Sequence, residues 1–323
     1  NQGSISYSSF TCIESLITLF IALSNDLEFR EKDGIQVVII IFTFSFIWAF
    51  GGHLSQTKRI LFDSFIRDIF GSFLNLPNRG LVYDWTIDTD KATWSHWSDH
   101  VPKFQESAST DFDFNASGCP TIYVQTNETY RISFIMKLFL HMKKNIILRG
   151  PNGIGKTLLV NELLTEIQNN DSEFNYFPVE FTPQTTSQSA YNFLMNCLER
   201  KHGEYLRPVC DKSSVLYIEN INSAQPDAID LLREIYGSHT LYLRPSYQCL
   251  PVTKLSLLGI ASPSNELNPR FMKHAAILEM TPFDSATSTH IVHSILQLFF
   301  SKFEDPIKNA ESRISNSIVS IYE

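Results

Sequence analysis

Residues 150–157 carry the clearest chemical signal in the chain, because they read Gly-Pro-Asn-Gly-Ile-Gly-Lys-Thr. This is a complete P-loop pattern, G-x-x-x-x-G-K-[ST], in which glycines let backbone N–H groups close around phosphates. In such a loop Lys156 reaches the outer phosphates and Thr157 is a ligand for Mg²⁺. The sequence therefore predicts a site for ATP or ADP with Mg²⁺. Its expected binding residues are Gly150, Pro151, Asn152, Gly153, Ile154, Gly155, Lys156, Thr157 and Leu158.

The segments on either side of this loop are the ones that a phosphate site requires. An apolar stretch at 145–148 predicts a strand before the loop. After the loop, Val160, Leu163 and Ile167 recur at helical spacing, which predicts an amphipathic helix. An ordinary glycine-rich turn between a strand and a helix is the alternative, but it does not explain why a lysine and a threonine follow Gly155.

The second half of an ATPase site is expected at the end of a neighbouring apolar strand, where acidic residues orient Mg²⁺ and polarise the attacking water. The predicted strand 215–218 ends in Glu219 and Asn220. Glu219 can serve Mg²⁺, although it is longer than the usual aspartate. Asn220 stands at the position of the second carboxylate, and an amide cannot accept a proton. Because general-base assistance is worth roughly 10² to 10⁴ in rate, we expect binding with weak or absent hydrolysis.

Two more polar residues are candidates for the chemistry of hydrolysis. Ser262 follows the predicted strand 255–261, where a polar side chain would sense the γ-phosphate or the water. Its side chain is shorter than an amide and would reach less well. Arg270 lies in a basic stretch near a helix end and is a candidate arginine finger for a neighbour's nucleotide. A surface ion pair is the alternative role for Arg270.

Composition limits the possible partners of this 323-residue chain. A net charge of -8 and a pI near 5.6 disfavour nucleic acid. The five cysteines are widely spaced without a C-x-x-C pair, as expected of reduced thiols in a cytosolic protein. Residues 35–50 are nearly all apolar, but they fall short of the ~20 residues that cross a bilayer. We therefore expect a buried helix there and no membrane partner.

Hydrophobic periodicity divides the chain into four parts. Residues 1–75 should form a small helical domain, and residues 76–120 a connection that tryptophans anchor to the body, with a ligand surface as their alternative role. Residues 121–284 alternate apolar strands and helices, which predicts an α/β domain with a parallel sheet covered on both faces. Residues 285–323 should start a further helical subdomain.

The same periodicity predicts the individual elements. The expected helices are 11–23, 35–50, 57–70, 129–142, 188–200, 226–236 and 285–303. The expected strands are 122–124, 145–148, 177–181, 215–218, 255–261 and 274–280.

Several spaced motifs resemble the dynein heavy chain family, at the third AAA+ module of its motor ring. The segments FIWAFGG and FDSFIR resemble the helical lid that closes the second module, and WSHW resembles the W-x-x-W of the connection that follows. The segment VQTNETYR is similar to V-P-T-x-D-T-x-R of the family. Further similar segments are VEFTPQTTS at 179–187, IDLLR at 229–233 and RFMKH at 270–274.

The chain also departs from the family pattern. Where axonemal members have D-D-L-N-M-P, residues 219–224 read Glu-Asn-Ile-Asn-Ser-Ala. The second arginine of the family's R-F-L-R-H is Lys273, and the glycine-rich run after the sensor strand is shortened. These departures bear on hydrolysis at this module, and they leave the fold and the phosphate cradle intact.

The resemblance implies a P-loop AAA+ α/β fold, with a parallel sheet flanked by helices and preceded by the all-helical lid of the previous module. It implies neighbouring AAA+ modules of the same heavy chain as partners, and microtubules and other dynein chains as partners of the parent protein. The implied location is cytoplasmic and cytoskeletal, with the ciliary axoneme as the more specific option, since the axonemal pattern fits better than the cytoplasmic one.

The predicted function is therefore a regulatory nucleotide-binding module of a microtubule motor, with weak or no hydrolysis of its own. Two alternatives remain open at this point. The chain could be an active AAA+ ATPase that remodels proteins, or a structural module whose site is empty.

Overall fold

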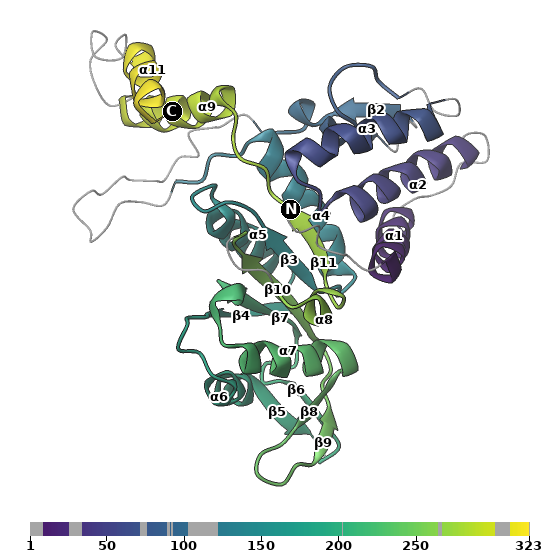
Figure 1. Cartoon of the computed structure of the whole chain (residues 1–323), viewed down its shortest axis with the longest axis vertical. Coiled ribbons are helices and arrows are strands. Elements are labelled where there is room, and N and C mark those ends of the chain that lie inside the picture. The colour runs from purple at the N-terminus through teal and green to yellow at the C-terminus, as the bar shows by residue number, and fades with distance from the viewer. Residues whose placement is uncertain are drawn as a thin grey trace.

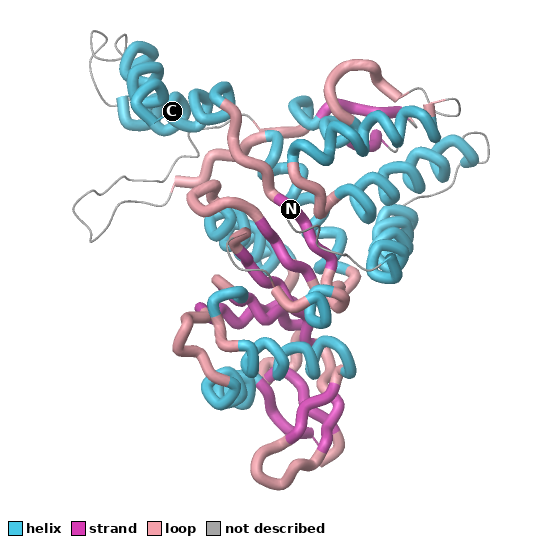
Figure 2. Tube along the Cα trace, in the orientation of Figure 1, coloured by secondary structure: helices cyan, strands magenta, loops and turns pink. Residues whose placement is uncertain are grey.

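The computed structural model shows a helical domain packed beside an α/β domain, with two further helices near the carboxyl end of the chain (Figure 1). Figure 2 shows that the strands of the central sheet run side by side between helices. The structure describes residues 9–25, 34–71, 76–88, 91, 93–102, 122–201, 203–263, 267–300 and 311–322.

The three amino-terminal helices lie where the sequence predicts them, and we call them the lid. Helix α2 is apolar on all sides and long enough to cross a membrane, yet half of its 18 residues are buried by the rest of the chain. Phe44, Ile47 and Trp48 in α2 are at most 2% exposed. A helix that is hydrophobic all round and lies in a packed core fits the expectation of a buried helix. The lid helices are α1 (Ser9–Ser24), α2 (Gly34–Gly51) and α3 (Gln56–Phe70).

The connection after the lid is more regular than expected, because it contains a two-stranded hairpin of β1 (Trp85–Asp88) and β2 (Thr93–His96). Trp97 anchors this segment as predicted: it is 2% exposed, and its indole N–H donates to the carbonyl of Tyr83 at 3.0 Å. Trp85 and Trp94 are only half-buried. Strands of four residues are too short for alternation to reveal them in the sequence.

A five-stranded parallel sheet forms the centre of the α/β domain, in the order β11-β3-β10-β7-β4. Continuous apolar runs such as residues 215–218 are buried on both faces, as parallel strands require. This confirms the predicted fold class. The strands are β3 (Ile146–Arg149), β4 (Phe174–Glu180), β7 (Ser213–Glu219), β10 (Leu255–Ala261) and β11 (Ala276–Glu279).

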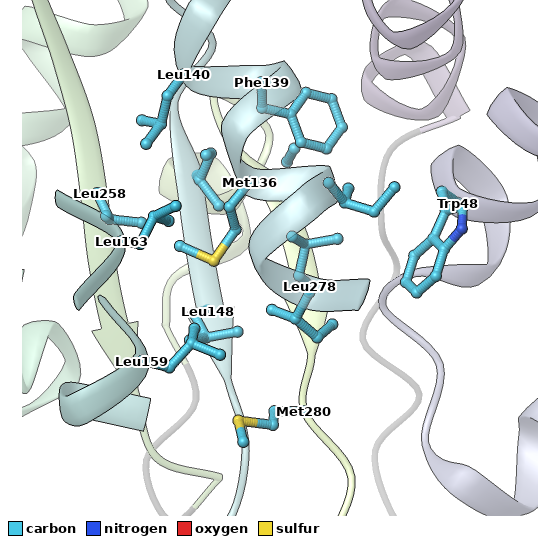
Figure 3. Packing of buried hydrophobic residues seen from close by; sticks show 14 of the residues in the cluster. Trp48, Met136, Phe139, Leu140, Leu148, Leu159, Leu163, Leu258, Leu278 and Met280 are labelled. Atoms are coloured by element: carbon cyan, nitrogen blue, oxygen red, sulfur yellow. The ribbon is translucent and has the colours of Figure 1, made fainter. Parts of the chain in front are cut away.

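Helices cover both faces of this sheet, and alternation along each strand separates two cores. In β7, Tyr217 joins the core that contains α4 and α5, whereas Leu216 and Ile218 join the core of α6 and α7. Figure 3 shows the first core, in which Met136 of α4 points toward the sheet and Trp48 of the lid approaches from the other side of α4. The helices are α4 (Asn127–His141), α5 (Lys156–Asn170), α6 (Ser187–Cys197) and α7 (Pro226–Ser238).

Three sequence-based expectations are wrong at the edges of this domain. Residues 122–124 form no strand, and they lead directly to Thr126, which caps α4. The predicted helix 188–200 ends at Cys197, and the next residues form a strand. Two hairpins were missed, because their pairing lies outside the main sheet and their strands have only three or four residues. They consist of β5 (Leu198–Lys201) with β6 (Tyr205–Pro208) and of β8 (Thr240–Tyr242) with β9 (Cys249–Pro251).

Four further elements follow β7 along the described chain. A single 3₁₀ turn follows β7, a short helix precedes β11, and two helices continue the chain after the sheet. The predicted helix 285–303 is confirmed up to residue 300, and its last three residues lie outside the described residues. These elements are η3 (Ile221–Ser223), α8 (Pro269–Met272), α9 (Ser285–Phe300) and α11 (Glu311–Tyr322).

The lid is fixed to the sheet by buried charges. Arg59 of α3 is 1% exposed and donates from Nη2 to the carbonyl of Glu279 at 2.6 Å. Its Nη1 lies 3.5 Å from Oε1 of Glu128, which also pairs with Arg131. The backbone N–H and the hydroxyl of Thr281 donate to the same oxygen at 3.1 and 3.0 Å. We call Arg59, Glu128 and Arg131 the lid cluster; it joins α3 to α4 beside strand β11.

Candidate nucleotide site

The glycine loop has the backbone that a phosphate cradle needs. Gly153 and Gly155 have φ values of +82° and +78°, a region that side chains other than glycine's rarely adopt. Gly150 is needed for a different reason, since a Cβ there would lie 2.7 Å from the carbonyl of Met280. Helix α5 begins at Lys156 directly after the loop, so its first backbone N–H groups lack helical partners and remain available to an anion.

The nine predicted binding residues therefore lie together between the end of β3 and the first turn of α5. Within this segment, Asn152, Gly153, Thr157 and Leu158 are exposed, whereas Ile154 and Lys156 are buried. A ligand can thus reach the loop from solvent, while the buried side chains of the loop fix it to the core.

Lys156 is a buried cation held only by neutral groups. It is 7% exposed, and its Nζ donates to the carbonyls of Gly150 and Pro151 at 2.8 and 2.6 Å. Burial lowers the pKa of this ammonium, and the nearby Glu279 acts in the opposite direction. Among the residues that the structure describes, Lys156 forms no ion pair. Buried charges in proteins are normally paired, so this lysine fits a site that receives an anion.

Oxygen donors suited to Mg²⁺ lie beside the loop. Thr157 is at the start of α5, and Glu219 ends strand β7, on the same strand face as Tyr217. The phenol of Tyr217 donates to Oε1 of Glu219 at 2.7 Å. Mg²⁺ usually takes one or two protein oxygens and completes its octahedron with phosphates and waters. The donor set therefore fits Mg²⁺, although the described residues contain no cluster of three acidic, histidine or cysteine ligands.

The residue at the water-polarising position, Asn220, has a neighbour that the sequence did not reveal. Asn220 adopts a left-handed conformation with φ of 51°, and its amide donates to Oε1 of Glu180 at 3.4 Å. Glu180 ends strand β4, which pairs in parallel with β7 so that Glu180 lies opposite Glu219. A carboxylate is thus present at this edge, on the adjacent strand. Only the strand order could have disclosed it.

Ser262 is fixed by hydrogen bonds with Asn222. The amide of Asn222 donates to the Ser262 carbonyl at 3.0 Å and to its hydroxyl at 3.1 Å. The backbone N–H of Ser262 donates back to Asn222 at 3.3 Å. Ser262 thus directly follows β10, and Asn222, just after the end of β7, is a partner that the sequence analysis missed.

Arg270 lies away from this chain's own phosphate loop. It is exposed on α8, where its backbone N–H donates to the capping side chain of Asn268 at 2.9 Å. Helix α8 precedes the amino end of β11, whereas the loop follows the carboxyl end of β3, and these two strands are parallel. Within the described part of the chain Arg270 makes no ion pair, so the structure does not bring it together with the other candidate residues.

Glu279 is a further residue that sequence analysis missed. Its carboxylate lies 3.7 Å from the guanidinium of Arg149, and burial raises its pKa, against the influence of Arg149, Arg59 and Lys156. Its backbone carbonyl accepts the bond from Arg59. Glu279 therefore touches the lid cluster through its backbone and faces the phosphate loop through its side chain.

Comparison with known proteins agrees with this architecture. The family model described as the P-loop containing dynein motor region matches residues 115–283, and the dynein heavy chain AAA lid domain matches residues 3–99. The chain belongs to the dynein heavy chain family. The parallel sheet with its loop is thus a dynein AAA+ motor region, and the three amino-terminal helices are a dynein lid domain.

Several dynein heavy chains are similar to this chain. The chain is 26% identical over 295 residues to human dynein axonemal heavy chain 6, covering 87% of this chain and 7% of that protein. It is 28% identical over 298 residues to the ciliary dynein beta chain of Heliocidaris crassispina, covering 87% of this chain and 6% of that protein. Dynein heavy chain-like protein 2 of Plasmodium falciparum is 24% identical and matches 99% of this chain. The chain spans less than a tenth of the length of these three relatives.

A likeness to a solved structure is weaker. A RuvB mutant of Thermotoga maritima superposes with a TM-score of 0.42 at 19% identity, over 60% of this chain and 57% of that chain.

Proposed function

We propose that this chain is a regulatory nucleotide-binding module of a dynein motor ring, the third module with the lid of the second. The observation that carries the proposal is Lys156, a buried cation that donates to two backbone carbonyls, and forms no ion pair among the described residues, at the start of α5 after a glycine loop of the correct conformation. The phosphates of ATP or ADP supply the missing anion. Nucleotide occupancy can then bias neighbouring modules, because a ligand that binds one arrangement better shifts the population toward it.

Hydrolysis at this site is slow or absent under the proposal. Bound Mg²⁺ would supply charge neutralisation on the phosphates, with Thr157 and Glu219 as its protein-side donors. Asn220 can orient a water molecule by hydrogen bonding, but its amide cannot accept the proton that the water must lose. The hydroxyl of Ser262 accepts a hydrogen bond from the amide of Asn222, which holds this short side chain beside the end of β7.

Phosphate release by the isolated chain tests the assignment of Asn220. We expect slow release by the unmodified chain and an increase of roughly 10² or more in Asn220→Glu, since a general base is worth about 10² to 10⁴. Fluorescent ATP and ADP should bind both proteins with similar affinity. If the unmodified chain releases phosphate at a rate that Asn220→Glu does not raise, the assignment is wrong. Absence of nucleotide binding would favour a structural module with an empty site.

One observation favours the second candidate, an active AAA+ ATPase. The carboxylate of Glu180 lies 3.4 Å from the amide of Asn220 and could take the role that the amide cannot. Under this alternative the unmodified chain hydrolyses ATP readily, and Glu180→Gln abolishes release while nucleotide still binds. Glu173→Gln, an exposed change just before the other end of the same strand, is the matched control. If Glu180→Gln leaves a slow rate unchanged, the regulatory assignment stands.

The proposed partners and location of this chain are those expected of a dynein heavy chain. In a ring, the exposed Arg270 at the amino end of the sheet would reach a neighbouring module's nucleotide as an arginine finger, since it lies away from this chain's own loop. The partners are the adjacent AAA+ modules of the same heavy chain, and through the parent protein other dynein chains and microtubules. The location is the cytoskeleton, with the ciliary axoneme favoured by the axonemal relatives.

A further inference from the structure

Tyr217 contacts Glu219, one of the two residues that would offer oxygen to Mg²⁺. Its side chain is 1% exposed and packs in the core beneath α5, with Leu159 and Val160. Its phenol donates to Oε1 of Glu219 at 2.7 Å. The carboxylate at the end of β7 is thus tied to a ring that the core holds in place.

The direction of this hydrogen bond follows from chemistry. An ionised carboxylate can only accept, so the phenol of Tyr217 is the donor and Oε1 of Glu219 is the acceptor. The second oxygen of Glu219 remains available to a cation.

The hydrogen bond from Tyr217 restricts a long and flexible side chain, that of Glu219. A glutamate has one more rotatable bond than an aspartate, and ordering it when a metal binds costs conformational entropy. A carboxylate already tethered in the folded protein avoids part of that cost. Tyr217 supplies the tether, two residues earlier on the same face of β7.

We propose that Tyr217 is a positioning residue that holds Glu219 in place for the Mg²⁺ bound with the nucleotide. The inference rests on the proposed nucleotide site. Partners that orient metal ligands are typically worth about 10- to 100-fold in metal affinity, so loss of the phenol hydroxyl should weaken Mg²⁺ binding by roughly 10-fold. It should leave the affinity for metal-free nucleotide nearly unchanged, because the phosphate cradle is untouched.

The test uses the complete 323-residue chain and the Tyr217→Phe variant, which keeps the ring in the core. Mn²⁺ serves as a paramagnetic substitute for Mg²⁺, and electron paramagnetic resonance measures free Mn²⁺ during titration of the protein–ADP complex. A competition with Mg²⁺ gives the affinity for the native ion. Fluorescent ADP measured in excess chelator gives the affinity for nucleotide alone.

A matched control separates positioning from packing. Tyr236 is also a buried tyrosine, 3% exposed, and its hydroxyl has no hydrogen-bond partner among the residues that the structure describes. Tyr236→Phe removes the same atom far from the loop and should not change Mn²⁺ affinity. In a Glu219→Gln background, Tyr217→Phe should have little further effect, since the carboxylate that it positions is gone.

The outcomes are distinct. A loss of about 10-fold in Mn²⁺ affinity, confined to Tyr217→Phe and dependent on Glu219, supports the inference. Normal nucleotide binding with unchanged Mn²⁺ affinity in Tyr217→Phe overturns it and leaves the proposed function standing. Failure of the unmodified chain to bind ADP overturns both.

Discussion

The lid cluster and Lys156 of the phosphate loop differ in how completely their charges are paired. In the lid cluster every charge meets an opposite one: Glu128 faces both Arg59 and Arg131, and Thr281 satisfies it further. In the phosphate loop, Lys156 meets two neutral carbonyls. The difference indicates that the first group serves the structure, whereas the second is completed by a ligand.

The pKa values express the same contrast. For Glu128, burial alone would raise the pKa, but Arg131, Arg59 and the bonds from Thr281 outweigh it and lower the pKa. For Lys156, burial dominates and lowers the pKa of the ammonium. A fully paired charge is therefore kept in its charged form by the fold, while an unpaired one is disfavoured until an anion arrives.

The largest expected effect is the loss of the central carboxylate of the lid cluster. Glu128→Gln leaves two guanidinium groups near each other without it, and breaking a buried pair in this way costs about 3–5 kcal/mol of unfolding free energy. Urea unfolding measures the change. The control is Glu166→Gln, because Glu166 is 49% exposed and pairs with Lys137 on the surface. That pair should contribute about 0–1 kcal/mol, and equal losses in both variants would contradict the contrast.

Lys156→Ala should affect binding and leave the fold intact. Truncating one partner of a buried charged contact costs about 2–5 kcal/mol, so the affinity for ATP and ADP should fall by at least roughly 30-fold. The unfolding free energy should change by less than about 1.5 kcal/mol, because only hydrogen bonds to neutral carbonyls are lost. Titration with fluorescent nucleotide and urea unfolding separate the two quantities. Undiminished affinity would mean that the loop does not hold phosphate.

The change in stability at acid pH should reveal the charge of Glu128 in the lid cluster. The pKa of Glu128 is lowered in the folded state, so its contribution is complete above its ordinary value of 4.5 and is lost as the pH falls through the lower folded value. The stability difference between the unmodified chain and Glu128→Gln should therefore shrink toward acid. Thermal unfolding from about pH 7 to about pH 3 measures it. A difference that stays constant over this range would show that Glu128 is not charged in the fold.

The smallest effect concerns Ser262, whose hydroxyl accepts a hydrogen bond from the amide of Asn222. Ser262→Ala removes that hydrogen bond, and its loss should cost about 0.5–1.5 kcal/mol of stability. The ratio of ATP to ADP affinity should stay the same. A selective loss of ATP binding would instead show that the hydroxyl contacts the γ-phosphate. Ser262 would then resemble Lys156, because its partner would be the bound nucleotide.

The sequence determined the features that depend on neighbouring residues. The glycine loop, the apolar strands 215–218 and 255–261 and the three lid helices all follow from local spacing, and the structure places them where that spacing predicts. Their signals are strong because backbone conformation and burial repeat with short periods along the chain.

Only the tertiary structure decided which polar groups meet. Arg59 and Glu128 are 69 positions apart, and Asn222 and Ser262 are 40 apart, so no local pattern links them. The short distance between Glu180 and Asn220 depends on β4 lying beside β7, and strand order is a property of the whole sheet. Chain folding brings such groups together through long-range packing, because burial of apolar faces fixes the strands and the polar ends then find their partners.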